Sequence, residues 1–190
     1  MRVFFVDAPP ELLEERRRLG LDVRDELWEG VVHVVPQPET DHQVFTGRFL
    51  AALLPLADER GLVLAYDVAI YRPGEEKSNY RVPDLVLARP EYKARRGIAG
   101  PPELVVETLS PHDEPRAKLP FYAAIGCLEV LLIDRARRAL EVCRLIDGDV
   151  VRVVPDKAGT AHIQALGVDL SVVGPSLRLA WDGGEAEIAL

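Results

Sequence analysis

Two acidic residues, Asp84 and Glu107, lie in successive apolar segments of the chain, and a lysine, Lys118, follows them. The segments read Val-Pro-Asp-Leu-Val-Leu over 82–87 and Glu-Leu-Val-Val-Glu-Thr-Leu-Ser-Pro over 103–111. A carboxylate inside a buried strand costs free energy unless it is paired, hydrogen-bonded or bound to a metal. The chain therefore favours a sheet that gathers these carboxylates at one polar site.

The residue types suit a divalent cation. Hard cations such as Mg²⁺ prefer oxygen ligands, and a metal with a nearby lysine is the minimal equipment for phosphodiester hydrolysis. Each residue also has an ordinary interpretation. Glu107 could end a strand in solvent, Asp84 could bond its own backbone in a turn, and Lys118 could be a solvated helix lysine.

Hydrophobic periodicity and turn signals predict an α+β fold with a mixed sheet and two main helices. Thr40 is expected to cap the first helix, and Pro55 to kink or split it. The core elements are helices over 40–60 and 114–125, a hairpin over 26–35, and strands over 62–71, 82–88, 104–109 and 128–134. A β-rich C-terminal part is expected to contain strands over 139–145, 150–154, 161–166 and 176–180.

Chain length and hydropathy indicate one domain. The chain has 190 residues, and we expect a single domain over 1–190 with its core at about 20–145 and a C-terminal β extension at about 146–190. No apolar run is long enough to span a membrane, and the short apolar start is broken by Asp7. These features predict a cytoplasmic protein without a membrane partner.

The formal net charge of −8 argues against a broad basic surface, so any contact with nucleic acid should be local. Arg95 and Arg96 are candidate phosphate contacts, although paired arginines are also common on solvated faces. The two cysteines, Cys127 and Cys143, are expected to be buried and reduced, without a zinc site.

Several motifs together resemble one bacterial family. The Pro83-Asp84 pair, the 103–111 segment and a helix running from Lys118 to Gly126 carry the resemblance. Glu26-Leu27-Trp28-Glu29-Gly30 and His42-Gln43 add to it. Over about residues 10–145 the chain resembles the Uma-type restriction endonucleases, which fall within the PD-(D/E)XK nuclease superfamily.

The resemblance implies a restriction-endonuclease-like core in which Asp84 and Glu107 bind the metal and Glu26 completes the site. The superfamily's usual lysine would stand at position 109, where this chain has Leu109. In the resembling family the lysine is moved to the next helix, which matches Lys118. The segment before it, 111–117, is shorter than in typical members.

Two hypotheses of different classes follow. The first is a Mg²⁺-dependent (or Mn²⁺-dependent) endonuclease acting on DNA, with Asp84, Glu107 and the Thr108 carbonyl as ligands and Lys118 acting on the water or the transition state. His42 would contact phosphate or orient a neighbouring side chain. The second is a noncatalytic relative that serves as a dimerisation or nucleic-acid-binding module.

A homodimer is expected, because cleavage of a duplex needs two active sites or one that rebinds, and because two-fold dimers are the commonest oligomers. Apolar residues of the C-terminal part are expected to contribute to the interface. They are Val150, Val151, Val153, Val154, Leu166 and Val168.

Overall fold

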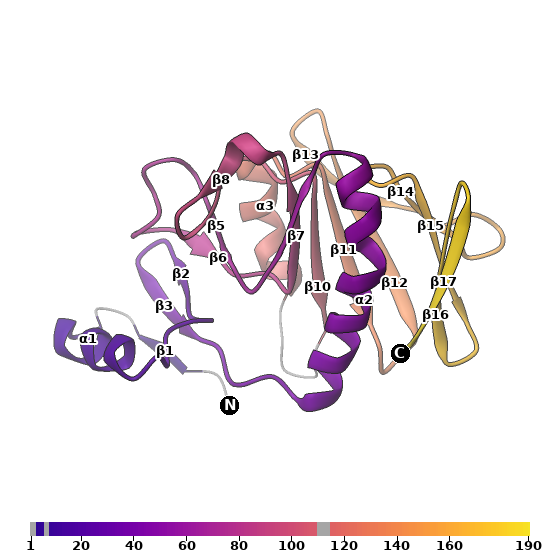
Figure 1. Ribbon diagram of the computed structural model, residues 1–190. Helices are drawn as coiled ribbons and strands as arrows, with labels where there is room; N and C mark the ends of the chain where they lie inside the picture. The colour runs from indigo at the N-terminus through magenta and orange to yellow at the C-terminus, as the bar shows by residue number, and fades with distance from the viewer. Residues whose placement is uncertain (1–2, 6–7, 110–114) are drawn as a thin grey trace.

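The computed structural model describes residues 3–5, 8–109 and 115–190, and it confirms the α+β class (Figure 1). The described part of the chain contains three sheets of seven, six and four strands. Its α-helices are α1 (Pro10–Arg18), α2 (Thr40–Glu59) and α3 (Leu119–Ile125), with 3-10 turns η1 (Pro90–Tyr92) and η2 (Pro115–Lys118). No helix among these residues is long and apolar enough to cross a membrane.

The central sheet has six strands in the order β13-β12-β11-β10-β7-β4. Its strands β10 and β11 are parallel and its other neighbours are antiparallel. The strands are β4 (Val63–Tyr66), β7 (Leu85–Ala88), β10 (Leu104–Thr108), β11 (Glu129–Asp134), β12 (Ala139–Ile146) and β13 (Asp149–Val153). The predicted neighbours 82–88 and 104–109 thus pair directly, as β7 and β10.

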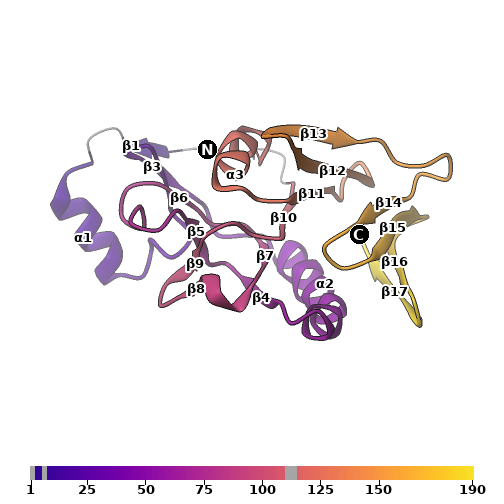
Figure 2. The same ribbon diagram turned by 90° about the horizontal axis from the view of Figure 1, so that it is seen from above.

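Helices α2 and α3 cover opposite faces of the central sheet (Figures 1 and 2). Residues of β7 and β10 are buried on both faces, which explains why β7 is apolar throughout and β10 is apolar up to Glu107. Alternate residues face alternate helices: Leu85 and Val106 join the cluster around α2, whereas Val86 and Val105 join the cluster around α3. The sheet therefore separates two apolar layers.

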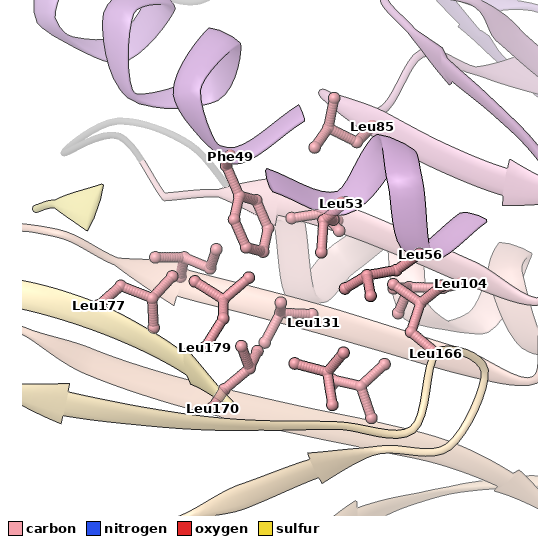
Figure 3. Packing of buried hydrophobic residues seen from close by; sticks show 14 of the residues in the cluster. Phe49, Leu53, Leu56, Leu85, Leu104, Leu131, Leu166, Leu170, Leu177 and Leu179 are labelled. Carbon is pink, nitrogen blue, oxygen red and sulfur yellow. The ribbon is translucent and has the colours of Figure 1, made fainter. Parts of the chain in front are cut away.

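Helix α2 supplies Phe49, Leu53 and Leu56 to the larger cluster (Figure 3). It runs unbroken from Thr40 to Glu59 with Pro55 inside it, so of the kink or split expected at Pro55 the split is wrong, and the kink stays a prediction. The expected Thr40 cap is also wrong, because the N-cap is Glu39 and no side-chain capping bond forms. Burial of this apolar face stabilises the helix despite the proline.

The C-terminal sheet packs on the same cluster. Leu170, Leu177 and Leu179 lie close to α2 and the central sheet in Figure 3. Its order is β14-β15-β16-β17, with β14 (Ala161–Ile163), β15 (Val168–Val173), β16 (Ser176–Trp181) and β17 (Gly184–Ala189). Buried Glu129 also joins the two sheets, since it accepts bonds from Arg144 and from the backbone of Gln164 and Ala165.

The seven-stranded sheet carries the N-terminal hairpin. Its order is β1-β3-β2-β6-β5-β9-β8. The strands are β1 (Val3–Phe5), β2 (Glu26–Trp28), β3 (Val31–Val34), β5 (Ala69–Tyr71), β6 (Tyr80–Arg81), β8 (Lys93–Ala94) and β9 (Gly97–Ala99). The predicted hairpin forms from β2 and β3, and Glu29 and Gly30 both have positive φ in its tight turn.

Three further local differences separate the prediction from the structure. The strand expected over 62–71 is two strands, because Asp67 adopts a left-handed conformation with φ of 49° and directs the chain into a second sheet. The helix expected over 114–125 is α3 preceded by η2, with Lys118 at the junction. Strands β15 and β17 complete the C-terminal sheet and were not predicted as separate elements.

Candidate active site

Five predicted side chains meet at one end of the central sheet. Asp84 immediately precedes β7, Glu107 lies near the end of β10, and Lys118 ends η2. Glu26 begins β2, and His42 lies in the first turn of α2. All five are buried, with exposed fractions between 2 % and 9 %. The fold thus brings together polar groups from five separate segments.

The register of β7 and β10 places Asp84 beside Glu107. Leu85 pairs with Val106, so the next position joins the two acidic residues. The Thr108 N–H donates to Asp84 Oδ2 at 2.7 Å, which ties Asp84 to the end of β10. Both residues extend the face that carries Val86, since side chains alternate along each strand. The expected neighbouring placement is therefore present.

Asp84 is held as a carboxylate. Burial raises its pKa, but contacts with His42, the Thr108 N–H and the charge of Lys118 lower it, and the net pKa lies below its usual value. His42 Nε2 lies 3.1 Å from Asp84 Oδ1. His42 thus contacts Asp84, and its predicted roles, contact with phosphate or orientation of a neighbouring side chain, stay predictions.

Glu107 has the opposite balance. Burial raises its pKa to about 8, with Asp84 and Glu26 adding to the rise while Lys118 and Tyr122 oppose it. Its Oε1 accepts hydrogen bonds from Lys118 Nζ at 2.9 Å and from the Tyr122 hydroxyl at 2.5 Å. A carboxyl group with a shifted pKa beside a second carboxylate is typical of functional sites.

Lys118 is shared between two carboxylates. Its Nζ lies 2.8 Å from Glu26 Oε1 and 2.9 Å from Glu107 Oε1. Glu26 is fixed in turn, because its Oε1 accepts from the Val82 N–H and its Oε2 accepts from Trp28 Nε1. The lysine predicted to act on the substrate is therefore buried, and its Nζ lies between the carboxyl groups of Glu26 and Glu107.

The predicted phosphate contacts lie further out. Arg95 and Arg96 form the exposed turn between β8 and β9. The next residue, Gly97, pairs with Ala69, two residues after Asp67. The turn therefore reaches the edge of the sheet at which Asp67 hydrogen-bonds to the Asp84 backbone.

Several site residues were not predicted from the sequence. Tyr122 was noted only as part of a motif, yet its hydroxyl contacts Glu107. Arg24 lies in an irregular segment without periodicity, and its guanidinium contacts Asp84 and Asp67. Arg81 stacks between the rings of Trp28 and Phe121, and so supports the residue that holds Glu26. Only the burial of a charged residue in a strand could have suggested Arg81.

The cysteines and the two remaining described histidines have ordinary structural environments. Cys127 and Cys143 are buried and free, as expected. His162 is exposed and contacts Asp169, and His33 stacks on Trp28. The shortened 111–117 segment falls largely outside the described residues, which omit 110–114.

The site fits a cation that retains water. No group of three His, Cys, Asp or Glu side chains placed to hold a metal occurs within the described ranges. Mg²⁺ needs fewer protein ligands than that, because it usually keeps several waters and binds one or two carboxylates together with substrate phosphates. The carboxylates of Asp84 and Glu107 and the carbonyl of Thr108 supply an oxygen donor set of this kind.

The fold is similar to that of a solved structure. A crystal structure described as a "putative nuclease belonging to DUF820", from Anabaena variabilis, matches with a TM-score of 0.60. The two sequences are 16% identical, and the match covers 75% of this chain and 83% of that one. No curated protein matches the sequence.

The sequence also matches a protein family over most of its length. Residues 10–173 match the Uma2 family, described as "Putative restriction endonuclease". The chain belongs to the Uma2 family. This confirms the resemblance seen in the motifs and extends it beyond residue 145.

The pKa of Glu107 predicts an unusual pH dependence of stability in EDTA. Between the ordinary pKa of 4.5 and about 8, the folded protein binds more protons at Glu107 than the unfolded chain does. Stability therefore falls as pH rises through this range. Glu107→Gln removes this loss, so its free energy of unfolding relative to that of wild type should rise by roughly 3 kcal/mol from pH 5 to pH 8.

Thermal melts of both proteins check this prediction. A gain of that size corresponds to about 4 °C or more in Tm for a chain of this length. A difference in Tm that stays constant across pH would contradict the raised pKa of Glu107.

Proposed function

We propose that this protein is a metal-dependent endonuclease that hydrolyses DNA phosphodiester bonds. The observation that carries the proposal is the buried pair Asp84 and Glu107 with Lys118 bonded to Glu107, in a chain of the Uma2 family. Burying two acidic groups side by side costs stability, and proteins keep such costs mainly at functional sites.

The proposed ligands are Asp84, Glu107 and the Thr108 carbonyl, and the proposed cation is Mg²⁺ or Mn²⁺. Bound there, the cation would supply Lewis-acid chemistry at a phosphate and lower the pKa of water. Asp84 enters this state as a carboxylate already oriented by His42 and the Thr108 N–H. Glu107 must lose its proton, and the nearby Lys118 charge favours that loss.

Lys118 is proposed to orient the attacking water and to stabilise the negative charge that develops on the phosphate. Its ammonium is fixed by Glu26 and Glu107, so little reorganisation is needed during the reaction. Glu26 was expected as a further metal ligand. Because both of its oxygens already accept hydrogen bonds, its contacts favour a positioning role toward Lys118.

DNA is the proposed substrate, and Arg95 and Arg96, in the exposed turn between β8 and β9, are proposed phosphate contacts. The net charge of −8 restricts binding to such local features. His42 contacts Asp84, which supports an orienting role more than direct phosphate contact.

Cleavage of supercoiled and linear DNA in Mg²⁺, Mn²⁺ and EDTA tests this function. We expect cleavage with either cation and none in EDTA. Calorimetry should also show divalent-metal binding at neutral pH that depends on Asp84. A protein with neither property would instead be a noncatalytic relative that keeps the fold as a binding or dimerisation module.

A homodimer remains our proposal for the assembly. Leu166 and Val168 are 1% exposed and pack in the core, so they cannot form the interface that we expected of them. Val151 and Val154 are exposed, and β13 is an edge strand of the central sheet. This edge is the proposed contact between copies, because unpaired strand edges can pair with another chain. Sedimentation showing only a 21.1 kDa species at micromolar concentration would contradict it.

A further inference from the structure

Arg24 lies between two carboxylates at the rim of the site. Its Nη2 is 3.3 Å from Asp84 Oδ1 and 3.3 Å from Asp67 Oδ1. The side chains of Arg24 and Asp67 are 16% and 24% exposed, whereas that of Asp84 is 7% exposed. Arg24 and Asp67 are therefore more exposed to solvent than the Asp84 carboxylate that the guanidinium contacts.

The contacts of Arg24 are longer than those of the other buried arginine pairs. Arg16 lies 2.6 Å from Asp25, and Arg144 lies 2.8 Å from Glu129. Charge-assisted hydrogen bonds are usually about 2.7–2.9 Å long. Arg24 is thus shared between Asp84 and Asp67 without an optimised bond to either, and its displacement from Asp84 costs less than breaking a bidentate pair.

The charge of the site requires a cation before it can accept a phosphate. Lys118 is already engaged by two carboxylates, which leaves Arg24 as the cation on the solvent side among the described residues. Even with Glu107 protonated, the other three of the four carboxyl groups outnumber these two basic groups, so a phosphodiester would be repelled. The four carboxyl groups belong to Glu26, Asp67, Asp84 and Glu107.

A divalent cation changes this balance in a specific way. It would compete with Arg24 for Asp84 Oδ1, because both are positive and both need the same oxygen. Asp67 would still hold the guanidinium through its other contacts, at 3.3 Å and 3.4 Å. The guanidinium N–H groups of Arg24 that are released from Asp84 would then face a site whose negative charge is offset by the cation.

We propose that Arg24 is a phosphate-binding residue: it leaves Asp84 when a divalent cation binds and donates to a nonbridging oxygen of a DNA phosphodiester, while Asp67 keeps its guanidinium in place. The planar guanidinium fits phosphate oxygens better than an ammonium does. This assignment rests on the proposed nuclease function and adds a residue, and an order of binding, to it.

Two binding measurements on Arg24→Gln test the assignment without relying on turnover. Calorimetry with Ca²⁺ measures affinity for a hard, oxygen-seeking cation. Fluorescence anisotropy with a labelled DNA duplex, with and without Ca²⁺, measures phosphate binding, and a gel confirms that the duplex stays intact. Arg89→Gln is the matched control, because Arg89 pairs with Glu103 at the opposite end of β7 and β10.

The two affinities should change in opposite directions. Arg24→Gln should bind Ca²⁺ about threefold or more tightly, since a competing charge is removed from Asp84. In Ca²⁺ it should bind the duplex about tenfold more weakly, and the slope of log affinity against log salt should shrink by about one phosphate contact. Arg24→Lys should retain part of the duplex binding, and Arg89→Gln should resemble wild type in both measurements.

Each alternative result overturns the assignment in a recognisable way. Loss of both affinities in Arg24→Gln would make Arg24 a structural clamp for Asp84. If Arg24→Gln binds the duplex as tightly as wild type does, Arg24 is not a phosphate-binding residue. The proposed DNA substrate is unaffected by that result. Failure of wild type to bind the duplex in Ca²⁺ would overturn the assignment together with the proposed DNA substrate.

Discussion

Asp84→Asn is expected to abolish metal binding and DNA cleavage together. The substitution keeps the shape of the side chain but removes the charge that a divalent cation requires. Asp84 is also the carboxylate that its surroundings keep ionised, because His42 and the Thr108 N–H both contact it. We expect metal affinity to fall by about a hundredfold or more, and cleavage to fall below detection.

Calorimetry with Mg²⁺ and Mn²⁺ and a plasmid-nicking assay check the two losses. Glu129→Gln is the matched control, because Glu129 is an equally buried strand carboxylate that pairs with Leu104, away from the Glu107 end of β10. Thermal melts of both variants separate loss of function from loss of folding. Metal affinity retained in Asp84→Asn would exclude Asp84 as a ligand and end the proposed mechanism.

The acidic pair was predictable from the sequence for a local reason. A strand has a two-residue repeat, so an acidic residue in an apolar strand must either meet a partner or face solvent. Successive apolar strands often pair, and β7 and β10 do so. Glu107 and Asp84 could thus be predicted to lie side by side from the sequence alone. The same reasoning located Lys118, because η2 and α3 directly follow this part of the chain.

The remaining contacts depend on tertiary geometry that local patterns do not encode. Arg24 lies in an irregular segment, and its partner Asp84 is distant in sequence. Tyr122 reads as an apolar helix residue until the direction of α3 aims its hydroxyl at Glu107. The change of sheet at Asp67 depends on one residue with positive φ, which propensity alone does not predict.

The proline in α2 also shows that local sequence preference does not decide every element. Local chemistry predicts that Pro55 breaks the helix, because it removes a backbone hydrogen bond. Packing of Phe49, Leu53 and Leu56 against the central sheet outweighs that local cost. Tertiary burial thus decided the element where sequence preference opposed it.

Lys118→Met is expected to reduce cleavage by about a hundredfold or more while metal binding stays within a few-fold of wild type. The loss is the scale typical of one preorganised charge in an active site. Methionine retains an unbranched apolar stem, so the buried volume is largely kept. The ammonium of Lys118 is the group that lies against both Glu26 and Glu107, and it is lost.

A second variant separates a chemical role from a structural one. In Lys118→Met, Glu26 and Glu107 lose the cation between them, and this alone could disturb the site. Lys118→Met/Glu26→Gln removes the uncompensated charge and should recover thermal stability. If Lys118 acts on the water or the transition state, cleavage by the double variant stays low. If Lys118 only neutralises Glu26 and Glu107, the double variant regains cleavage, and Lys118 has no part in the reaction itself.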